Sequence, residues 1–280
     1  MSKKVLIIGL GLIGGSYAEG LTRKGYEVGA LSNNKEDIDF ALQKGIISSG
    51  TDKIEKDYIS QFGLVIFALY PRTLLSWIKE NQDCLKENAI LTDVTGIKGA
   101  IVREIQSILR PDLEFIGAHP MAGREVSGVQ NANADIFKNA NYIITPTENN
   151  SGTAIEVCRT IGEELEFKNI SVLSPEEHDE MIGFLSQLTH CIAITLITCR
   201  NSEELSKYSG DSFRDLTRIA KINENMWTEL FLLNKSELLR QMDAFSKEFD
   251  KLRDYIAKED ESKIKEMMKL STEKRKAFDK

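Results

Sequence analysis

The sequence contains few residues of the kinds that bind metals or form disulfides. Four cysteines occur in 280 residues, none in a Cys-x-x-Cys pair, and no cysteine–histidine cluster has the spacing of a zinc site. We therefore expect neither a disulfide framework nor a metal centre. Small buried thiols in a reducing compartment are the expectation for Cys84, Cys158, Cys191 and Cys199.

Positive charge and long apolar runs are also scarce. The formal net charge is −7, and because nucleic-acid binding needs a basic surface, we do not expect nucleic acid as the main partner. A small anionic substrate needs only a local positive site and stays possible. The N-terminal run Val5–Ile8 is too short for a targeting segment, and the most apolar later run, Cys191–Cys199, is far below the roughly 18 residues of a membrane span. We expect a cytoplasmic protein without a membrane segment.

The first two-thirds of the sequence alternate short β-branched runs with helical stretches. Strands that alternate with helices of this length form βαβ units, so the pattern predicts an α/β fold with a Rossmann-like, mostly parallel sheet and helices on both faces. The predicted strands are Val5–Ile8, Glu27–Leu31, Leu64–Leu69, Ala89–Thr92, Glu114–Gly117, Tyr142–Thr145 and Ile170–Leu173. The predicted helices are Gly14–Lys24, Lys35–Lys44, one beginning at Thr73, Lys98–Leu109 and Thr153–Leu165.

The pattern changes at Ser174. The run Ser174-Pro175-Glu176-Glu177 has a capping serine, a proline at the first helical position and a glutamate at the third. From there the periodicity is helical, and the Lys/Glu-rich segment 244–278 is typical of a solvated helix pair with one packed face. We predict an α/β domain at residues 1–173 and an all-α domain at 174–280. The apolar stripes of the second domain are Met181, Leu185, Leu188 and Ile192, and then Met226, Leu230, Leu233 and Leu238.

A glycine-rich turn directly follows the first strand and opens the first helix. Gly9, Gly11 and Gly14 fit the pattern G-x-G-x-x-G. In this context the first glycine permits a tight turn, the second lets the backbone approach a pyrophosphate, and the third allows close helix–strand packing, while the helix N-terminus faces the anion. We predict a nicotinamide dinucleotide on this turn. Further predicted cofactor contacts are Leu12 and Ile13 in the turn and Leu69 at the end of the third predicted strand.

The end of the second strand bears on the choice between NAD and NADP. An acidic residue is expected there for the ribose diol of NAD, but the sequence has Ser32-Asn33-Asn34-Lys35. The missing carboxylate removes a repulsion against a 2′-phosphate, and Ser32, Asn33 and Lys35 could bind one. Alternatively, Ser32 or Asn33 bonds the diol of NAD. On balance the residues favour NADP.

His119 is one of three histidines in the chain and follows a short predicted strand in the loop sequence Ala118-His119-Pro120-Met121-Ala122-Gly123. It is expected at the carboxyl end of the sheet, where open α/β sheets bind ligands. This position makes His119 a candidate general base, with a structural histidine as the alternative. His178, in the first turn of the long helix, is expected to be a solvated or packing residue, and spacing alone does not place His190.

Several of these segments together resemble the prephenate/arogenate dehydrogenase family of tyrosine biosynthesis. They are Gly9–Ser16, Asp93–Lys98, Ala118–Gly123, Ser186–His190, Asp215–Ala220 and Met226-Trp227. The resemblance spans residues 5 to about 245. It implies an NAD(P)-dependent oxidative decarboxylation of prephenate to 4-hydroxyphenylpyruvate, with His119 as the base, Arg218 binding a substrate carboxylate, and His190 and Trp227 in the pocket. It also implies a homodimer through the C-terminal helices.

Three positions depart from the family pattern. The usual serine after the Asp93 strand falls on Gly96, so we expect the hydroxyl of Thr95 to substitute for it. The first histidine of the Ser-His-x-x-His segment falls on Gln187, which keeps a donor but cannot become cationic. The residue after Gly123 is Arg124, which either supplies the missing substrate-binding charge or lies on the surface. These departures put the substrate contacts, not the fold, in question.

Other activities stay open at this point. The neutral Asn225 lacks a carboxylate for the ammonium group of arogenate, so we favour prephenate over arogenate. A β-hydroxyacid dehydrogenase or imine reductase would also pair a Rossmann domain with helices, although such enzymes typically use Lys or Ser/Thr chemistry. A dinucleotide-binding protein without activity is the third possibility, and only the three departures suggest it.

Overall fold

The computed structural model describes residues 3–124, 126–201 and 204–279. Its contacts divide the chain into two compact units, one ending at Asn234 and the other beginning at Lys235. The first unit contains a sheet that has eight strands within the described ranges, in the order β3-β2-β1-β4-β5-β6-β7-β8. The strands are β1 (Lys4–Ile8), β2 (Glu27–Leu31), β3 (Ser49–Thr51), β4 (Leu64–Phe67), β5 (Ile90–Asp93), β6 (Glu114–Pro120), β7 (Asn141–Thr145) and β8 (Asn169–Val172).

The pairing of the strands confirms the predicted fold class. All pairs from β3 across to β6 are parallel, β7 lies antiparallel to β6, and β8 is parallel to β7. The order β3-β2-β1-β4-β5-β6 is that of a doubly wound dinucleotide-binding sheet, in which the chain direction across the sheet reverses between β1 and β4. Ligands bind outside the carboxyl ends of the strands at such a reversal. The short strand β3 is an addition to the predicted strands.

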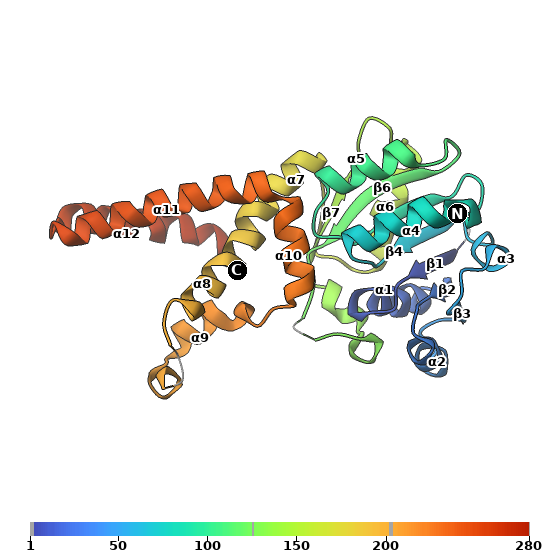
Figure 1. Cartoon of the computed structure of the whole chain (residues 1–280), viewed down its shortest axis with the longest axis horizontal. Coiled ribbons are helices and arrows are strands. Elements are labelled where there is room, and N and C mark those ends of the chain that lie inside the picture. The colour runs from blue at the N-terminus through green and yellow to red at the C-terminus, as the bar shows by residue number, and fades with distance from the viewer. Residues whose placement is uncertain (1–2, 125, 202–203, 280) are drawn as a thin grey trace. The chain divides into compact units, whose positions relative to one another are not determined.

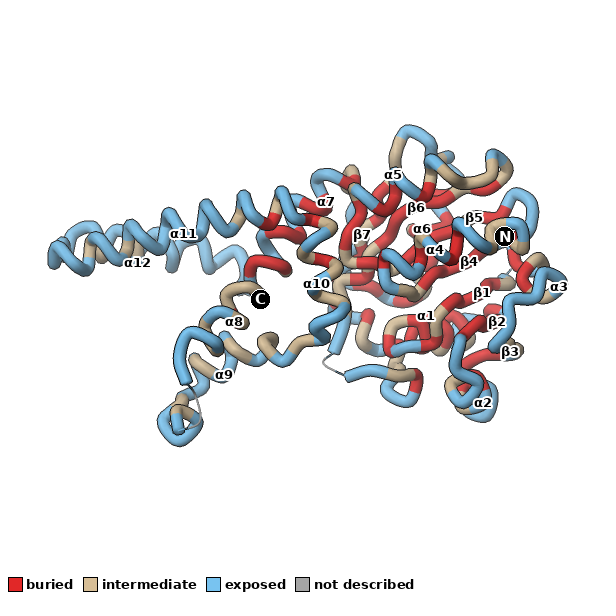
Figure 2. Tube along the Cα trace, viewed as in Figure 1, coloured by how far each residue is buried: buried red, intermediate tan, exposed pale blue. Residues whose placement is uncertain are grey.

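Helices cover both faces of the sheet, as Figure 1 shows. On one face, α1, α2 and α6 bury Leu21, Ile38 and Ile161 against strand residues such as Val5. On the other face, α3, α4 and α5 bury their apolar sides against alternating residues of the same strands. The α-helices that precede β8 in the chain are α1 (Leu12–Arg23), α2 (Lys35–Gln43), α3 (Lys56–Ile59), α4 (Pro71–Asn81), α5 (Gly99–Ile108) and α6 (Gly152–Glu164). Figure 2 shows that the buried residues concentrate in this sheet and its flanking helices.

A long helical stretch follows the sheet and begins with the predicted capping box. The Ser174 side chain accepts from the backbone N–H of Glu177, and the Glu177 side chain accepts from the N–H of Ser174. The stretch comprises α7 (Pro175–Ile182), a π-helical turn (Gly183–Leu188) and α8 (Thr189–Thr198). The remaining helices of the unit are α9 (Asp211–Thr217) and α10 (Glu224–Leu233).

The π-helical turn overturns part of the predicted apolar stripe. Met181 and Leu185 are exposed, whereas Ile182 and Gln187 are buried. A π turn holds one more residue than an α turn, so it shifts which side chains face inward, and a stripe drawn at α-helical spacing across it is wrong. The second predicted stripe agrees better with the structure, because Met226, Leu230 and Leu233 all pack against the apolar core on the face of the sheet that α4 and α5 cover.

Residues 175–198 also correct the expectation that no apolar stretch is long enough to span a membrane. By length and apolar composition alone, this helix of 24 residues could cross one. A single such helix is weak evidence for a membrane span. Its first half carries the buried side chains of His178 and Ile182, as a packed helix of a folded domain does.

The second unit, residues 235–279, consists of two helices packed against each other. They are α11 (Lys235–Ala257) and α12 (Glu261–Arg275), separated by a short turn in which Glu259 has a φ of +51°. Many of its charged side chains form pairs three or four residues apart, such as Lys265 with Glu261. The predicted helix pair is therefore present, and it begins nine residues earlier than the Lys/Glu-rich segment suggested. Short 3-10 turns elsewhere are Gln82–Cys84, Val129–Asn131, Ala134–Phe137, Leu205–Tyr208, Arg218–Ala220 and Lys276–Phe278.

Candidate active site

The glycine turn has the geometry that a dinucleotide needs. Gly9 has a φ of +102°, and a Cβ there would lie 2.5 Å from the carbonyl oxygen of Ala68. A Cβ at Gly14 would overlap the carbonyl oxygen of Gly9. At Gly11, in contrast, a Cβ would meet nothing within 4 Å. Gly9 and Gly14 are therefore required by the fold itself, whereas the backbone at Gly11 is open to an incoming group.

Gly11 is also the N-cap of α1, and because it has no side chain it cannot satisfy the first N–H groups of the helix. The first helical residues, Leu12 and Ile13, follow directly. A helix N-terminus whose amides face open space attracts an anion such as a pyrophosphate. Leu69, just beyond β4, comes within 3.0 Å of the Cβ position at Gly9, so it lies at the strand-order reversal beside the turn.

The polar residues after β2 lie at the same edge of the sheet. Ser32 is buried, its N–H donates to the carbonyl of Thr51 at 3.2 Å, and its hydroxyl accepts from the N–H of Asn34 at 3.4 Å. Asn33 is exposed. The ammonium of Lys35 donates to both carboxylate oxygens of Asp39, at 2.7 and 2.6 Å, and this pairing raises the pKa of Lys35. The one cation predicted to meet a 2′-phosphate is thus paired with an acid of its own helix.

A buried ion pair anchors the loop after β5. Asp93 accepts from the ammonium of Lys98 at 2.6 Å, and both side chains are fully buried. The same carboxylate accepts from the N–H of Ala118, at 3.1 Å, on the neighbouring strand β6. Burial lowers the pKa of Lys98, and the adjacent Asp93 opposes that shift. Because each charge has its partner and further hydrogen bonds, the pair ties the loop 94–98 to the strand that carries His119.

The structure places Thr95 differently from the expectation. Its hydroxyl is buried and bonds to the carboxylate of Asp93 and the carbonyl of Ile97, and it accepts from the ammonium of Lys98. The hydroxyl is thus engaged in the ion-pair network of the loop, and its substitution for the family's serine stays a prediction. Gly96 faces the site, since a Cβ there would lie 3.8 Å from Cε1 of His119.

His119 is half-buried near the carboxyl end of β6 and is held by two residues of α7. Its Nδ1 lies 2.9 Å from Nε2 of His178, and Nδ1 of His178 lies 2.8 Å from Oδ1 of Asp179. The Asp179 carboxylate also accepts from the N–H groups of Lys98 and Gly99, each at 2.8 Å, at the N-terminus of α5. One continuous line of hydrogen bonds therefore runs from His119 through His178 to a carboxylate that caps a helix.

Burial governs the protonation of these three groups. It lowers the pKa of His119 well below its usual range, and the neighbouring His178 and Lys98 lower it further. Burial likewise lowers the pKa of His178 to about 3, helped by Lys98 and opposed by Asp93. Burial raises the pKa of Asp179 to about 6, although the two N–H donors counteract the shift. At neutral pH both histidines are neutral and Asp179 is mainly ionised.

These states fix the tautomers of the two histidines. Backbone N–H groups can only donate, so the Asp179 oxygens accept and Nδ1 of His178 carries its hydrogen. Nε2 of His178 is then an acceptor, and Nδ1 of His119 donates to it. Neutral His119 is left with its lone pair on Nε2, the state that a general base requires.

Helix α10 packs against α4 beside this line of hydrogen bonds. A methyl carbon of Leu230 would lie 3.6 Å from a Cβ at Gly96, which places Leu230 beside His119. Glu229 accepts from the N–H of Arg72, at 2.5 Å, at the start of α4. Asn223 donates to the hydroxyl of Tyr70 at 3.1 Å. The helix thus rests over the loops that follow β4 and β5.

Gln187 also takes a place other than the expected one. It is buried, its amide nitrogen donates to the carbonyl of Leu230 at 3.1 Å, and its oxygen accepts from Asn234 at 2.8 Å. The π-helical turn directs this side chain against α10. Gln187 therefore holds two helices together, and the expectation that it contacts the substrate is not supported by its hydrogen bonds.

Two further predicted residues are brought into direct contact. The rings of His190 and Trp227 pack with centroids 3.7 Å apart and planes tilted by 31°, and Nδ1 of His190 lies 2.9 Å from the carbonyl of Ser186. A carbonyl only accepts, so this nitrogen of His190 carries a hydrogen. Arg218 is exposed and lies in the 3-10 turn that packs against α8, the helix of His190. Arg124 is exposed in the loop that follows His119.

Sequence reasoning missed His178, Asp179 and the Asp93–Lys98 pair. His178 was expected to be solvated or to serve in packing, and the structure instead joins it to His119, 59 residues away in the sequence. One signal was available. An adjacent histidine and aspartate in the capped first turn of a helix is unusual in a chain with only three histidines.

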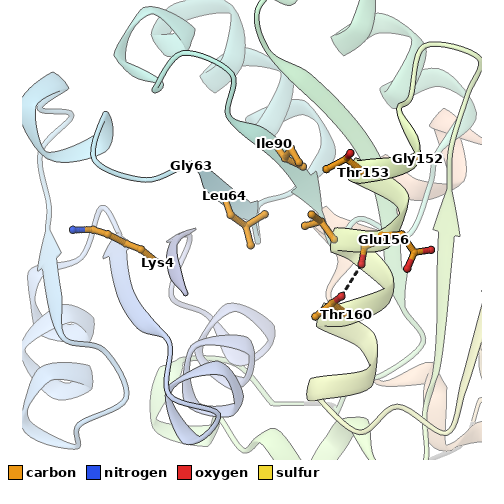
Figure 3. A pocket seen from close by; sticks show the side chains of 9 residues that line it. Lys4, Gly63, Leu64, Ile90, Gly152, Thr153, Glu156 and Thr160 are labelled. Atoms are coloured by element: carbon orange, nitrogen blue, oxygen red, sulfur yellow. Dashed lines mark hydrogen bonds between the residues drawn. The ribbon is translucent and has the colours of Figure 1, made fainter. Parts of the chain in front are cut away.

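A separate pocket of about 640 Å³ lies at the amino ends of the central strands (Figure 3). Its walls come from the starts of β1, β4 and β5 and from one side of α6. None of the residues that line it belongs to the predicted site. They are Lys4, Gly63, Leu64, Ile90, Gly152, Thr153, Glu156, Val157 and Thr160.

Comparison with known proteins agrees with this geometry. Residues 17–171 match the model of the prephenate dehydrogenase nucleotide-binding domain, and residues 174–270 match that of the prephenate dehydrogenase dimerization domain. Prephenate dehydrogenase of Bacillus subtilis (strain 168) is 31% identical over 93% of this chain and 72% of its own length. Cyclohexadienyl dehydrogenase of Zymomonas mobilis is 30% identical over 99% of this chain and 96% of its own.

Solved structures give the same result. Prephenate dehydrogenase from A. aeolicus, solved in complex with hydroxyphenyl propionate and NAD+, superposes with a TM-score of 0.90. The two chains are 32% identical, and the match covers 99% of this chain and 98% of the other. The two family models together take in the sheet from β2 onward, the His119 loop and most of the helices beyond it. This chain belongs to the prephenate dehydrogenase family.

Proposed function

We propose that this protein oxidises prephenate with NAD or NADP and releases carbon dioxide to form 4-hydroxyphenylpyruvate. The observation that carries the proposal is the placement of His119. Its Nε2 lone pair is fixed by His178 and Asp179 at the same sheet edge as the open glycine turn. A base beside a dinucleotide site is what oxidation of a ring hydroxyl needs.

In the proposed reaction, the residues of the chain have the following roles. A bound nicotinamide supplies the hydride acceptor, and the turn Gly9–Gly14 with the N-terminus of α1 holds its pyrophosphate. His119 accepts the proton of the substrate hydroxyl at Nε2. Arg218 binds a substrate carboxylate, His190 and Trp227 line the pocket against each other, and Arg124 supplies a further positive charge from the loop after His119.

The choice of coenzyme follows from Lys35. The case for NADP depends on this cation, but Asp39 already pairs with it at 2.6 Å, and Asp52 adds negative charge nearby. A 2′-phosphate would have to compete with that carboxylate, whereas the diol of NAD needs only polar groups such as Ser32 and Asn33. We therefore infer a preference for NAD, whereas the residues after the second strand, taken from the sequence alone, favour NADP. Asp39→Asn should improve the use of NADP.

Steady-state kinetics with prephenate and arogenate, each with NAD and NADP, test the proposal through absorbance at 340 nm. Turnover of prephenate is expected, with arogenate the poorer substrate because Asn225 offers no carboxylate to its ammonium group. His119→Asn should lower kcat by roughly 10²–10⁴-fold. Dinucleotide binding without turnover of either substrate would instead support a protein without this activity, and turnover of a β-hydroxyacid or an imine would support the other reductases.

Three broader properties belong to the same proposal. The match to a dimerization domain supports a homodimer through the C-terminal helices. The four cysteines, all within the described residues, are free thiols, as a reducing cytoplasm would keep them. We also retain a functional boundary between residues 173 and 174, where β8 ends and the capped helix begins, although the compact first unit continues to Asn234.

A further inference from the structure

During the oxidation of prephenate, His119 takes up a proton that the product needs back at the end of the reaction. The substrate loses a hydride and its hydroxyl proton, and the ring carboxylate then leaves as carbon dioxide while its bonding electron pair enters the ring. The product oxygen becomes a phenolate, which takes a proton at neutral pH because a phenol has a pKa of about 10. The proton that leaves the substrate hydroxyl is therefore replaced on the product oxygen within one turnover, and the overall reaction releases no proton.

His119 is poorly suited to keep that proton during the reaction. Its ring is packed beside His178, and the charged ammonium of Lys98 is close enough to disfavour a second positive charge. The charged groups that face the two histidines are Lys98 and Asp93, which are paired with each other, and Asp179. Of these groups, Asp179 is the carboxylate in direct hydrogen-bond contact with a histidine.

The hydrogen-bond line provides a route to that carboxylate. When Nε2 of His119 accepts the hydroxyl proton, its Nδ1 proton can pass over 2.9 Å to Nε2 of His178. The Nδ1 proton of His178 can then pass over 2.8 Å to Oδ1 of Asp179. Both imidazoles are neutral afterwards, with their tautomers exchanged, and Asp179 is a neutral carboxylic acid. No atom other than hydrogen moves, and no further reactant is needed.

We propose that His119, His178 and Asp179 form a proton relay, which stores the hydroxyl proton of the substrate on Asp179 during hydride transfer and returns it to the phenolate oxygen of the product. The inference rests on the proposed function. His119 is the catalytic base, and His178 and Asp179 act through it. The N–H donors of Lys98 and Gly99 hold the Asp179 carboxylate in line while it receives and returns the proton.

His178→Gln separates a relay from a merely structural contact. A glutamine oxygen can still accept from Nδ1–H of His119 and keep the base oriented, but an amide does not pass a proton on. If the relay operates, His178→Gln lowers kcat by about tenfold or more, leaves KM within about threefold, and raises the solvent deuterium isotope effect on kcat. Asp179→Asn, which keeps the shape of the side chain but cannot store a proton, should behave in the same way.

Glu177→Gln is the matched control, because Glu177 is an acid of the same helical turn whose side chain accepts from the N–H of Ser174 in the capping box. It should lower the melting temperature slightly and leave the isotope effect unchanged. NAD affinity measured for every variant verifies the fold, and if Asp179→Asn fails to bind NAD, His178→Gln decides the question. Absence of wild-type turnover would overturn the proposed function and the relay with it. Wild-type turnover, with His178→Gln active within twofold and an unchanged isotope effect, would overturn the relay alone.

Discussion

Two glycines of the same turn serve different purposes, and alanine substitutions can separate them. A methyl group at Gly14 would overlap the carbonyl oxygen of Gly9, whereas one at Gly11 meets nothing within 4 Å. Gly14→Ala should therefore destabilise the protein by roughly 1–3 kcal/mol through overpacking. Gly11→Ala should leave the melting temperature unchanged but weaken NAD binding at least tenfold, because the methyl group enters the space reserved for the pyrophosphate.

Thermal unfolding and titration with NAD measure the two effects, and each variant is the control for the other. Equal loss of stability in both would mean that the space at Gly11 is closed in solution. Unchanged NAD affinity in Gly11→Ala would place the pyrophosphate elsewhere and remove the turn from the site.

Single residues also show how far the sequence predicts this site. The positions of the glycines and of His119 are predictable, because they follow from local position at the end of a strand. His178 and Gln187 are not, since each is defined by a partner that only the fold brings near. Thr95 is not predictable either, because its partners lie close in the sequence but the conformation of its loop decides which of them it meets. The Thr95 hydroxyl bonds within its own loop to Asp93, and Gln187 bonds across to α10. Residue type alone does not reveal such partners.

At the scale of elements, the start of α7 positions both His178 and Asp179, and its capping box is the device that fixes it. Ser174→Ala removes the side chain that accepts from Glu177 and should cost about 1 kcal/mol. The melting temperature should fall by a few degrees. Because the helix remains folded at 25 °C, kcat should stay within about threefold of the wild type.

Ser171→Ala is the control for that experiment, since Ser171 is an exposed serine of β8 three residues earlier. Differential scanning calorimetry of both variants measures the effect. An equal fall in melting temperature for the two variants, or no fall for Ser174→Ala, would show that the capping box does not stabilise the start of α7.

The elements that sequence reasoning misplaced have a common cause. Strand β3 has only three residues, with a glycine at its centre, so apolar alternation does not mark it, and one β-branched residue, Thr51, is too weak a signal for a strand. Strand β7 runs antiparallel to β6, a direction that the composition of the strand does not reveal. The π-helical turn depends on packing of Gln187 and Leu188, which shifts the inward face relative to α-helical spacing. Periodicity predicts the kind of element better than its direction or register.

At the scale of the whole molecule, helix α11 carries a stripe that its own unit does not bury. Its apolar residues recur at alternating spacings of four and three, which is the pattern of helices that pack together along a seam. Phe249 and Ile256 are 60% and 58% exposed. The stripe comprises Leu238, Met242, Phe245, Phe249, Leu252 and Ile256, of which Leu238 is buried, Leu252 is half-buried and the other four are exposed. An exposed stripe of this length on a chain that matches a dimerization domain supports association with a second copy.

The homodimer can be tested on that stripe. Sedimentation equilibrium should give about 63 kDa, twice the chain mass of 31.5 kDa. The double substitution Phe245→Asp and Phe249→Asp places two charges in the seam and should yield monomers that still bind NAD, because the glycine turn belongs to the other unit. Lys247→Asp, which reverses a charge on the opposite side of the same helix, should remain dimeric. A wild-type monomer would remove the dimer from the proposal, and a dimeric double variant would place the interface on another surface.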